Sequence, residues 1–183
     1  MNTKRLVRIA LLLVLTILGG FIRVPFGSTY FTFQTLFVLL SGIFLGAKDG
    51  IFCQICYLIL GLVGIPIFAN GGGIFYFMQP SFGYLIAFPL SAFMVGRLLF
   101  AKLKTISIVK IWLVCVLSLL PIYLIGGAYQ VVILTTVYSL EITATITTTI
   151  LSLLPLLAFD IILCLVLALI VPKINNETNF ISA

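Results

Sequence analysis

Long apolar runs alternate along the chain with short polar or glycine-rich breaks. Six runs approach the roughly 17–25 apolar residues that a transmembrane helix needs, and they cover residues 6–22, 31–45, 51–68, 82–100, 111–138 and 155–171. The second run is short. The fifth is long and contains Pro121 and the Gly126 and Gly127 pair, so we expect it to tilt or kink. The pattern predicts an all-α integral membrane protein with six transmembrane helices, folded as a single membrane-embedded domain over residues 1–183.

Composition supports the membrane interpretation. Of 183 residues, 63% are hydrophobic and only 8% are charged, whereas soluble domains have roughly 45–50% apolar and about 25% charged residues. The opening "MNTKRLVRIALLLVLTILGG" resembles a signal peptide, but no small-x-small cleavage site follows it. We therefore expect a first helix that is retained.

The positive charges predict an orientation. If the N-terminus is cytoplasmic, nine of the ten Lys and Arg residues fall on inner segments and only Arg23 falls on an outer one, as the positive-inside rule requires. The inner residues are Lys4, Arg5, Arg8, Lys48, Arg97, Lys102, Lys104, Lys110 and Lys173. Both termini are then cytoplasmic, the protein lies in the cell membrane, and the net charge of +6 reflects topology rather than nucleic-acid binding.

Three nearly uncharged segments then face outward. They are residues 23–35, residues 69–84 and the threonine-rich residues 139–155. The last is too polar at its start for a span, so we expect an outer cap or short surface helix that continues into the sixth span.

One carboxylate interrupts the last apolar run. Asp160 has no Lys, Arg or His three or four positions away, and a charge at the bilayer centre costs on the order of 2.5–3.5 kcal/mol on insertion scales, which marks such a residue as functional by default. If the helix begins at Pro155, Asp160 lies roughly 8 Å below its outer end. The structural alternative is a helix-start stabiliser, or a protonated carboxyl group hydrogen-bonded inside the bundle.

At that depth Asp160 can meet groups from the outer segments. Small-molecule pockets combine an apolar lining with a few convergent polar groups, and the candidates here are Gln34, Asn70, Gln79 and Tyr84, the backbone of Gly71, Gly72 and Gly73, and Arg23. Six of the eight also have a purely structural interpretation: Gln34, Tyr84 and Arg23 as interfacial residues, and the three glycines as a flexible turn.

Little in the sequence indicates catalysis, metal binding or nucleotide binding. The chain has no His, no clustered acids and no phosphate-binding loop, so we expect no enzyme activity, no metal site and no cofactor. The four cysteines lie in apolar runs and are interpreted as small buried hydrophobes. Any uphill transport must draw on an ion gradient or on another subunit.

Four stretches resemble the BioY family, the biotin-binding S components of energy-coupling factor (ECF) transporters. They are "TFQTLFVLLSGIFLGAKDG", "YLILGLVGIPIFANGGG", "PSFGYLIAFPLSAFMVG" and "LLPLLAFD". The resemblance implies a membrane subunit that captures a vitamin from outside the cell and works with a transmembrane coupling subunit and two cytoplasmic ATPases. It also implies that Asn70 and Asp160 hold the ligand, because the ureido ring of biotin offers N–H donors to a carboxylate and a carbonyl to an amide.

The sequence departs from the family pattern beside the carboxylate. Members usually have Gly before this aspartate and Lys three residues after it, whereas this chain has Phe159 and Leu163. Without that Lys, Asp160 is either protonated or dependent on a cation from elsewhere, for which Arg23 is the only outward candidate. The alternatives to biotin are a lipoate-like or other carboxylate-bearing vitamin on the same scaffold, or a stand-alone ion-coupled transporter.

Overall fold

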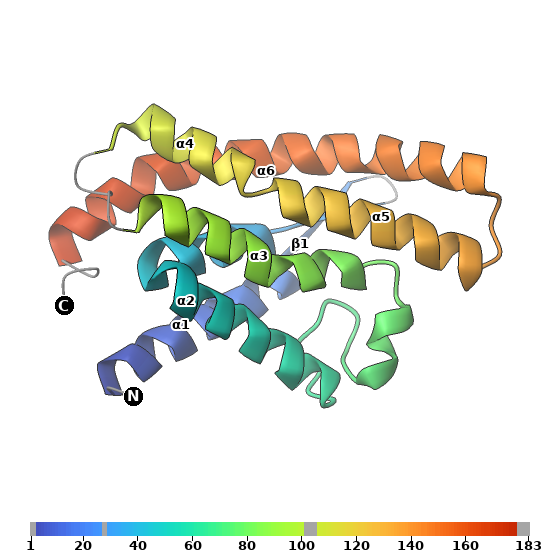
Figure 1. Cartoon of the computed structure of the whole chain (residues 1–183), viewed down its shortest axis with the longest axis horizontal. Coiled ribbons are helices and arrows are strands. Elements are labelled where there is room, and N and C mark those ends of the chain that lie inside the picture. Colours follow the sequence, from blue (N-terminus) through green and yellow to red (C-terminus); the bar gives the residue numbers. More distant parts are fainter. Residues whose placement is uncertain (1–2, 27–28, 101–105, 179–183) are drawn as a thin grey trace.

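A computed structural model describes residues 3–26, 29–100 and 106–178. Helices dominate it (Figure 1). The elements are α1 (Thr3–Phe21), β1 (Arg23–Phe26), β2 (Thr29–Thr32), α2 (Gln34–Leu62), the short 3₁₀ helix η1 (Ile74–Met78), α3 (Phe82–Leu99), α4 (Ile108–Leu117), α5 (Leu120–Thr136) and α6 (Ile142–Thr178). The two strands form an antiparallel hairpin in which Arg23 pairs with Thr32. The sequence pattern predicted no strand there, so the all-α prediction needs this addition.

Helix α2 reverses direction at Gly46. This glycine has φ 80° and ψ 174°, a left-handed conformation that is costly for residues with a side chain. The two arms of α2 then run antiparallel. Two hydrogen bonds between the arms show this: Gln54 donates to Ser41 Oγ at 2.9 Å, and Gln34 donates to the Tyr57 hydroxyl at 2.6 Å. The runs 31–45 and 51–68 predicted from the sequence are these two arms, and the helical part ends at Leu62 rather than at residue 68.

Helix α3 packs closely on the reversal of α2. A Cβ atom on Gly96 would lie 2.7 Å from the Ala47 nitrogen and the Gly42 oxygen, closer than real side-chain carbons approach. Only a glycine lets these backbones come so near. The predicted span 82–100 corresponds to α3 almost residue for residue.

The predicted fifth span is broken into α4 and α5. The break lies at Ser118 and Leu119, and Pro121 is the second residue of α5. A proline is tolerated in a first helical turn but lacks the N–H that would continue a helix through it. The kink expected from the sequence is therefore present.

Helix α6 is longer than predicted. It begins at Ile142, so Pro155 lies inside it instead of starting it, and the threonine-rich stretch is part of the same helix rather than a separate cap. The hydroxyls of Thr145, Thr147 and Thr148 donate to the carbonyls four residues before them, at 2.7–2.9 Å. Since these polar groups are satisfied within the helix, the stretch remains helical despite its polarity.

Four segments of the described chain are long and apolar enough to cross a membrane. They are Gln34–Leu62, Phe82–Leu99, Ile108–Thr136 and Ile142–Ile174. Helix α1 is not among them because Lys4, Arg5 and Arg8 occupy its first two turns. The folded arms of α2 belong to a single segment in this set.

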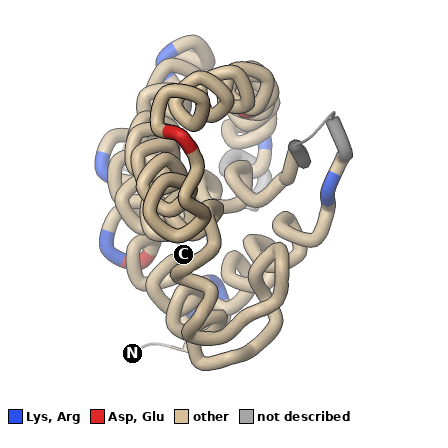
Figure 2. Tube along the Cα trace, turned by 90° about the vertical axis from the view of Figure 1, so that its right-hand side faces the viewer, with Lys and Arg blue, Asp and Glu red and all other residues tan. Residues whose placement is uncertain are grey.

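The described basic residues other than Arg23 gather at one end of the bundle. Helix α1 begins there, α2 reverses there, α3 ends there, α4 begins there and α6 ends there (Figure 1). Arg5 forms an ion pair with Asp49 beside the α2 reversal, with Nε 2.6 Å from Oδ2. Seen down the long axis, most of the trace carries neither Lys or Arg nor Asp or Glu (Figure 2). Lys102 and Lys104, also predicted at this end, lie outside the described residues.

Candidate functional site

A pocket of about 260 Å³ lies between the hairpin, α2, α3, α5 and α6, just below the ~300–1,000 Å³ common for ligand sites. Five of the residues singled out from the sequence line it: Arg23, Gln34, Asn70, Tyr84 and Asp160. Sequence reasoning missed Thr32, Thr35, Tyr76, Ser81 and Tyr123 as polar lining residues. The pocket is therefore apolar in its walls and polar at defined points.

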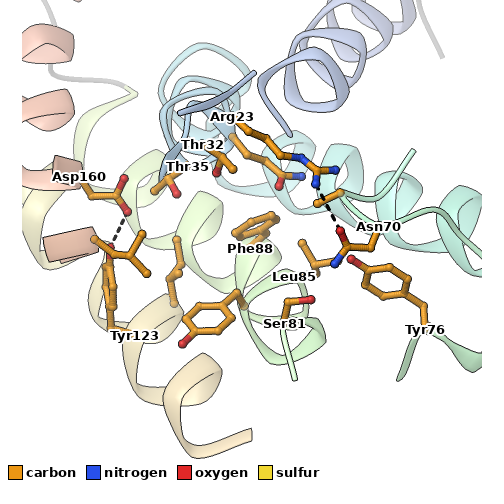
Figure 3. Close-up of a pocket in the computed structure, with 15 residues that line it drawn as sticks. Arg23, Thr32, Thr35, Asn70, Tyr76, Ser81, Leu85, Phe88, Tyr123 and Asp160 are labelled. Carbon is orange, nitrogen blue, oxygen red and sulfur yellow. Dashed lines mark hydrogen bonds between the residues drawn. The ribbon is translucent and has the colours of Figure 1, made fainter. Parts of the chain in front are cut away.

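Asp160 marks one end of the pocket (Figure 3). The Tyr123 hydroxyl on α5 donates to Oδ2 of Asp160 at 2.8 Å, and Thr35 on α2 lies beside the same carboxyl group (Figure 3). Asp160 is only 6% exposed, yet it borders the pocket. The polypeptide therefore orients the carboxyl group, and its hydrogen-bond donor comes from a neighbouring helix, where a search of its own helix could not find it.

Arg23 and Asn70 mark the opposite end. Arg23 Nη1 donates to Asn70 Oδ1 at 3.3 Å, and its Nε donates to the Gly20 carbonyl at 3.4 Å. Figure 3 places both residues across the pocket from Asp160. Arg23 therefore does not take the place of the missing Lys beside Asp160, which was one of the two alternatives that the sequence left open.

Two hydrogen bonds fix side chains in the pocket walls. Tyr84 donates to Gln130 Oε1 at 2.7 Å, and Gln34 donates to the Tyr57 hydroxyl at 2.6 Å. Tyr57 is fully buried, so its hydroxyl holds the Gln34 amide in one orientation in the pocket wall. A wall that is already ordered reduces the conformational entropy that the protein loses when a ligand binds.

Phe159, the residue before the carboxylate, packs on two aromatic rings near the start of α2. Its ring stacks on Phe31 with centroids 4.7 Å apart and meets Phe33 edge-on at 5.8 Å. Leu163 is buried in the protein rather than facing water. Of the two departures from the family pattern, Phe159 packs α6 against the hairpin and Leu163 packs it into the protein interior.

The glycine loop and Gln79 are not among the lining residues. The Gly73 N–H donates to the Gly61 carbonyl at 2.7 Å, and a Cβ on Gly72 would collide with the Ile65 carbonyl. Gly71 pairs with Phe68 through two backbone hydrogen bonds, while the Gln79 N–H closes the η1 turn onto Tyr76. The loop thus packs on the end of α2, and a ligand contact by Gly71, Gly72, Gly73 or Gln79 stays a prediction.

The described chain is a helical bundle with several segments of membrane length. Its small pocket has a carboxylate at one end and a guanidinium at the other. These features define a multi-pass membrane protein with a pocket for a small molecule. A family model described as the BioY family matches residues 1–180. The chain belongs to the BioY family.

Curated relatives and a solved structure agree with this assignment. A "Probable biotin transporter BioY" of Pyrococcus horikoshii is 40% identical over 127 residues, which are 69% of this chain and 74% of the relative. A "Probable biotin transporter BioY" of Lysinibacillus sphaericus is 46% identical over 98 residues, 54% of this chain, and the match spans about half of that relative's length. A crystal structure of the S-component for biotin from an ECF-type ABC transporter has the same fold, with TM-score 0.68 at 23% identity over 96% of this chain and 95% of the other.

Proposed function

We propose that this protein is the substrate-binding S component of an ECF-type vitamin transporter and that it captures biotin from outside the cell. The pocket carries the proposal, because its two polar ends match the two polar ends of biotin. Biotin has a ureido ring with N–H donors at one end and a carboxylate at the other, joined by an apolar body.

Asp160 is the acceptor for the ureido N–H groups. A buried carboxylate is a strong hydrogen-bond acceptor, and the bond from Tyr123 to Oδ2 at 2.8 Å holds it in place. The Thr35 hydroxyl borders the same end of the pocket and is the candidate donor for the ureido carbonyl.

Arg23 and Asn70 receive the carboxylate tail. Arg23 is the cation of the pocket lining, and guanidinium groups bind carboxylates in a forked geometry. The sequence suggested that Asp160 and Asn70 hold one ring together. The two residues lie at opposite ends of the pocket (Figure 3), so they serve opposite ends of the ligand in this proposal.

The pocket walls suit the middle of the ligand. Phe88, Leu85, Ile122 and Leu156 supply apolar surface between the two polar ends. Burying the thioether ring and the aliphatic chain against them contributes about 25 cal/mol per Å² of apolar surface.

The proposed topology has six crossings and cytoplasmic termini. The crossings are α1, the two arms of α2, α3, the α4–α5 pair and α6. The clustering of basic residues at one end supports placing that end in the cytoplasm. Arg23 and the pocket then open to the other side.

The proposed partners are a transmembrane coupling subunit and two cytoplasmic ATPases. Support comes from the fold shared with an S-component of an ECF-type ABC transporter and from the family assignment. Co-purification from native membranes, with mass spectrometry of the proteins retained, tests this assembly.

Calorimetry on the purified protein tests the ligand. We expect biotin to bind at micromolar concentration or below and lipoate, which lacks the ureido donors, to bind more weakly. No binding of biotin at micromolar concentration removes biotin as the ligand. Stronger binding of lipoate assigns the pocket to a relative of biotin with a carboxylate tail.

The buried Asp160 carboxyl group also fits a stand-alone transporter coupled to protons. Purified protein in liposomes distinguishes the two. An S component alone drives no uptake that depends on a proton gradient, whereas a coupled transporter loses its uptake when the gradient is collapsed.

A further inference from the structure

The η1 segment (Ile74–Met78) presents its side chains in two directions. Tyr76 is buried, lines the pocket and packs on Phe68 with ring centroids 4.6 Å apart. The other four side chains point outward and are exposed: Ile74, Phe75, Phe77 and Met78. Phe75 is 75% exposed. An apolar patch of this kind on a protein surface marks a contact with a partner or a membrane.

The segment lies about one membrane thickness from the basic end of the bundle. Along α3, Phe82 is fifteen residues from Arg97, roughly 22 Å at 1.5 Å per residue, and η1 directly precedes that end of α3 in the chain. Along α4 and α5, which are separated by a break, Tyr129 is nineteen residues from Lys110, at most roughly 28 Å, and its hydroxyl donates to the Phe77 carbonyl of η1. Because the hydrocarbon core is about 30 Å thick, both routes place η1 at the opposite membrane–water boundary.

Charge and surface character agree with that depth. Residues 50–96 contain no Lys, Arg, Asp or Glu, so no ionic group opposes partition of this region into lipid. Ile86, Leu90 and Phe93 form an exposed apolar stripe along α3, the helix that follows η1. Interfacial segments insert Trp, Phe and Leu side chains at the boundary between headgroups and acyl chains, and Phe75 and Phe77 are the exposed aromatic side chains of η1.

We propose that η1 is an interfacial anchor, embedded at the headgroup level of the leaflet opposite the basic end, with phospholipid as its partner. The outward side chains enter the lipid while Tyr76 forms a wall of the pocket. The membrane thereby holds one side of the pocket in place. This inference goes beyond the proposed function and does not depend on which ligand the pocket takes.

Tryptophan fluorescence tests the anchor in the full chain. Trp112 is the single tryptophan, so Trp112→Phe gives a silent background. Phe75→Trp reports the outward side and Tyr76→Trp, one position away, reports the inward side. Ile74→Trp is a second outward reporter if Phe75→Trp does not fold. Each variant is placed in phosphatidylcholine nanodiscs without biotin.

We expect lipid brominated near the headgroup to quench the fluorescence of Phe75→Trp and aqueous iodide to leave it unchanged. Bromine should quench Phe75→Trp more strongly than Tyr76→Trp. Quenching by iodide alone overturns the anchor and leaves the segment in water or on another protein. Quenching only by bromine near the chain ends also overturns it, because the segment then lies in the hydrocarbon core. Since no ligand is added, a failure of biotin binding does not affect the result.

Discussion

The Tyr123 hydroxyl on α5 donates to the Asp160 carboxylate on α6 across 2.8 Å. The acid that the last apolar run carries is therefore held by a donor from another helix, and the pocket borders both groups. In the proposed site, Asp160 accepts from the ureido ring and Tyr123 orients the carboxylate that does so.

Substituting these two residues should weaken biotin binding to different extents. Asp160→Ala removes the acceptor, so we expect at least a tenfold loss of affinity, about 1.4 kcal/mol or more. Tyr123→Phe removes only the donor that orients the carboxylate, so we expect a smaller loss. Calorimetry with both variants checks the order. An unchanged affinity for Asp160→Ala, with normal expression, assigns the carboxylate a structural role.

Arg23 should matter only for ligands with a negative tail. Hydrogen bonds to charged groups contribute about 1.5–3 kcal/mol, so Arg23→Ala should lower biotin affinity by roughly tenfold or more. The amide of biotin, which carries no charge, should bind the variant and the unchanged protein alike. Equal losses for both compounds would place Arg23 outside the tail-binding end.

The close contact at Gly96 should make α3 intolerant of a methyl group. Gly96→Ala places a carbon 2.7 Å from backbone atoms at the α2 reversal, and overpacking of this kind costs about 1–3 kcal/mol. Gly127→Ala is the matched control, because the atom it meets is the flexible Leu153 Cδ1 at 3.1 Å. Thermal unfolding in detergent should show a lower Tm for Gly96→Ala only. A Tm unchanged in both variants contradicts the tight packing of α3 on α2.

Tyr57 should stabilise the fold through Gln34. Tyr57→Phe leaves the buried Gln34 amide without its partner at 2.6 Å, and an unsatisfied buried donor costs about 1–3 kcal/mol. We expect a lower Tm, with a smaller effect on biotin affinity than Asp160→Ala produces. Tyr138→Phe, at a hydroxyl-bearing side chain that is 51% exposed, is the control and should leave the Tm unchanged.

The sequence pattern predicted most of the helical fold because apolar run length is set by the membrane. The pattern could not place the start of α6, where threonine hydroxyls donate to backbone carbonyls of the same helix. The hydroxyls of Thr145 and Thr148 bond within α6, so a stretch that is polar by composition remains helical. The β-hairpin was missed because its pairing of Arg23 with Thr32 depends on contacts that periodicity over four residues cannot show.

The site was predicted in part for a similar reason. An isolated acid in an apolar run is easy to recognise in a sequence. Arg23, Gln34, Asn70 and Tyr84 were recognised because they are polar residues in the segments expected beside it. Tyr123 and Thr35 lie inside other apolar runs, where a hydroxyl looks like an ordinary span residue. Their role follows only from the way α2, α5 and α6 come together around Asp160.

Helix α6 is longer than the apolar part of a membrane is thick. At 37 residues it is roughly 55 Å long, well beyond a hydrocarbon layer of about 30 Å. The hydroxyls of Thr145, Thr147 and Thr148 near its start donate to carbonyls of the same helix, so these three donors need no partner from lipid or from another chain. In a bilayer the helix therefore either extends past the hydrocarbon layer or lies inclined within it.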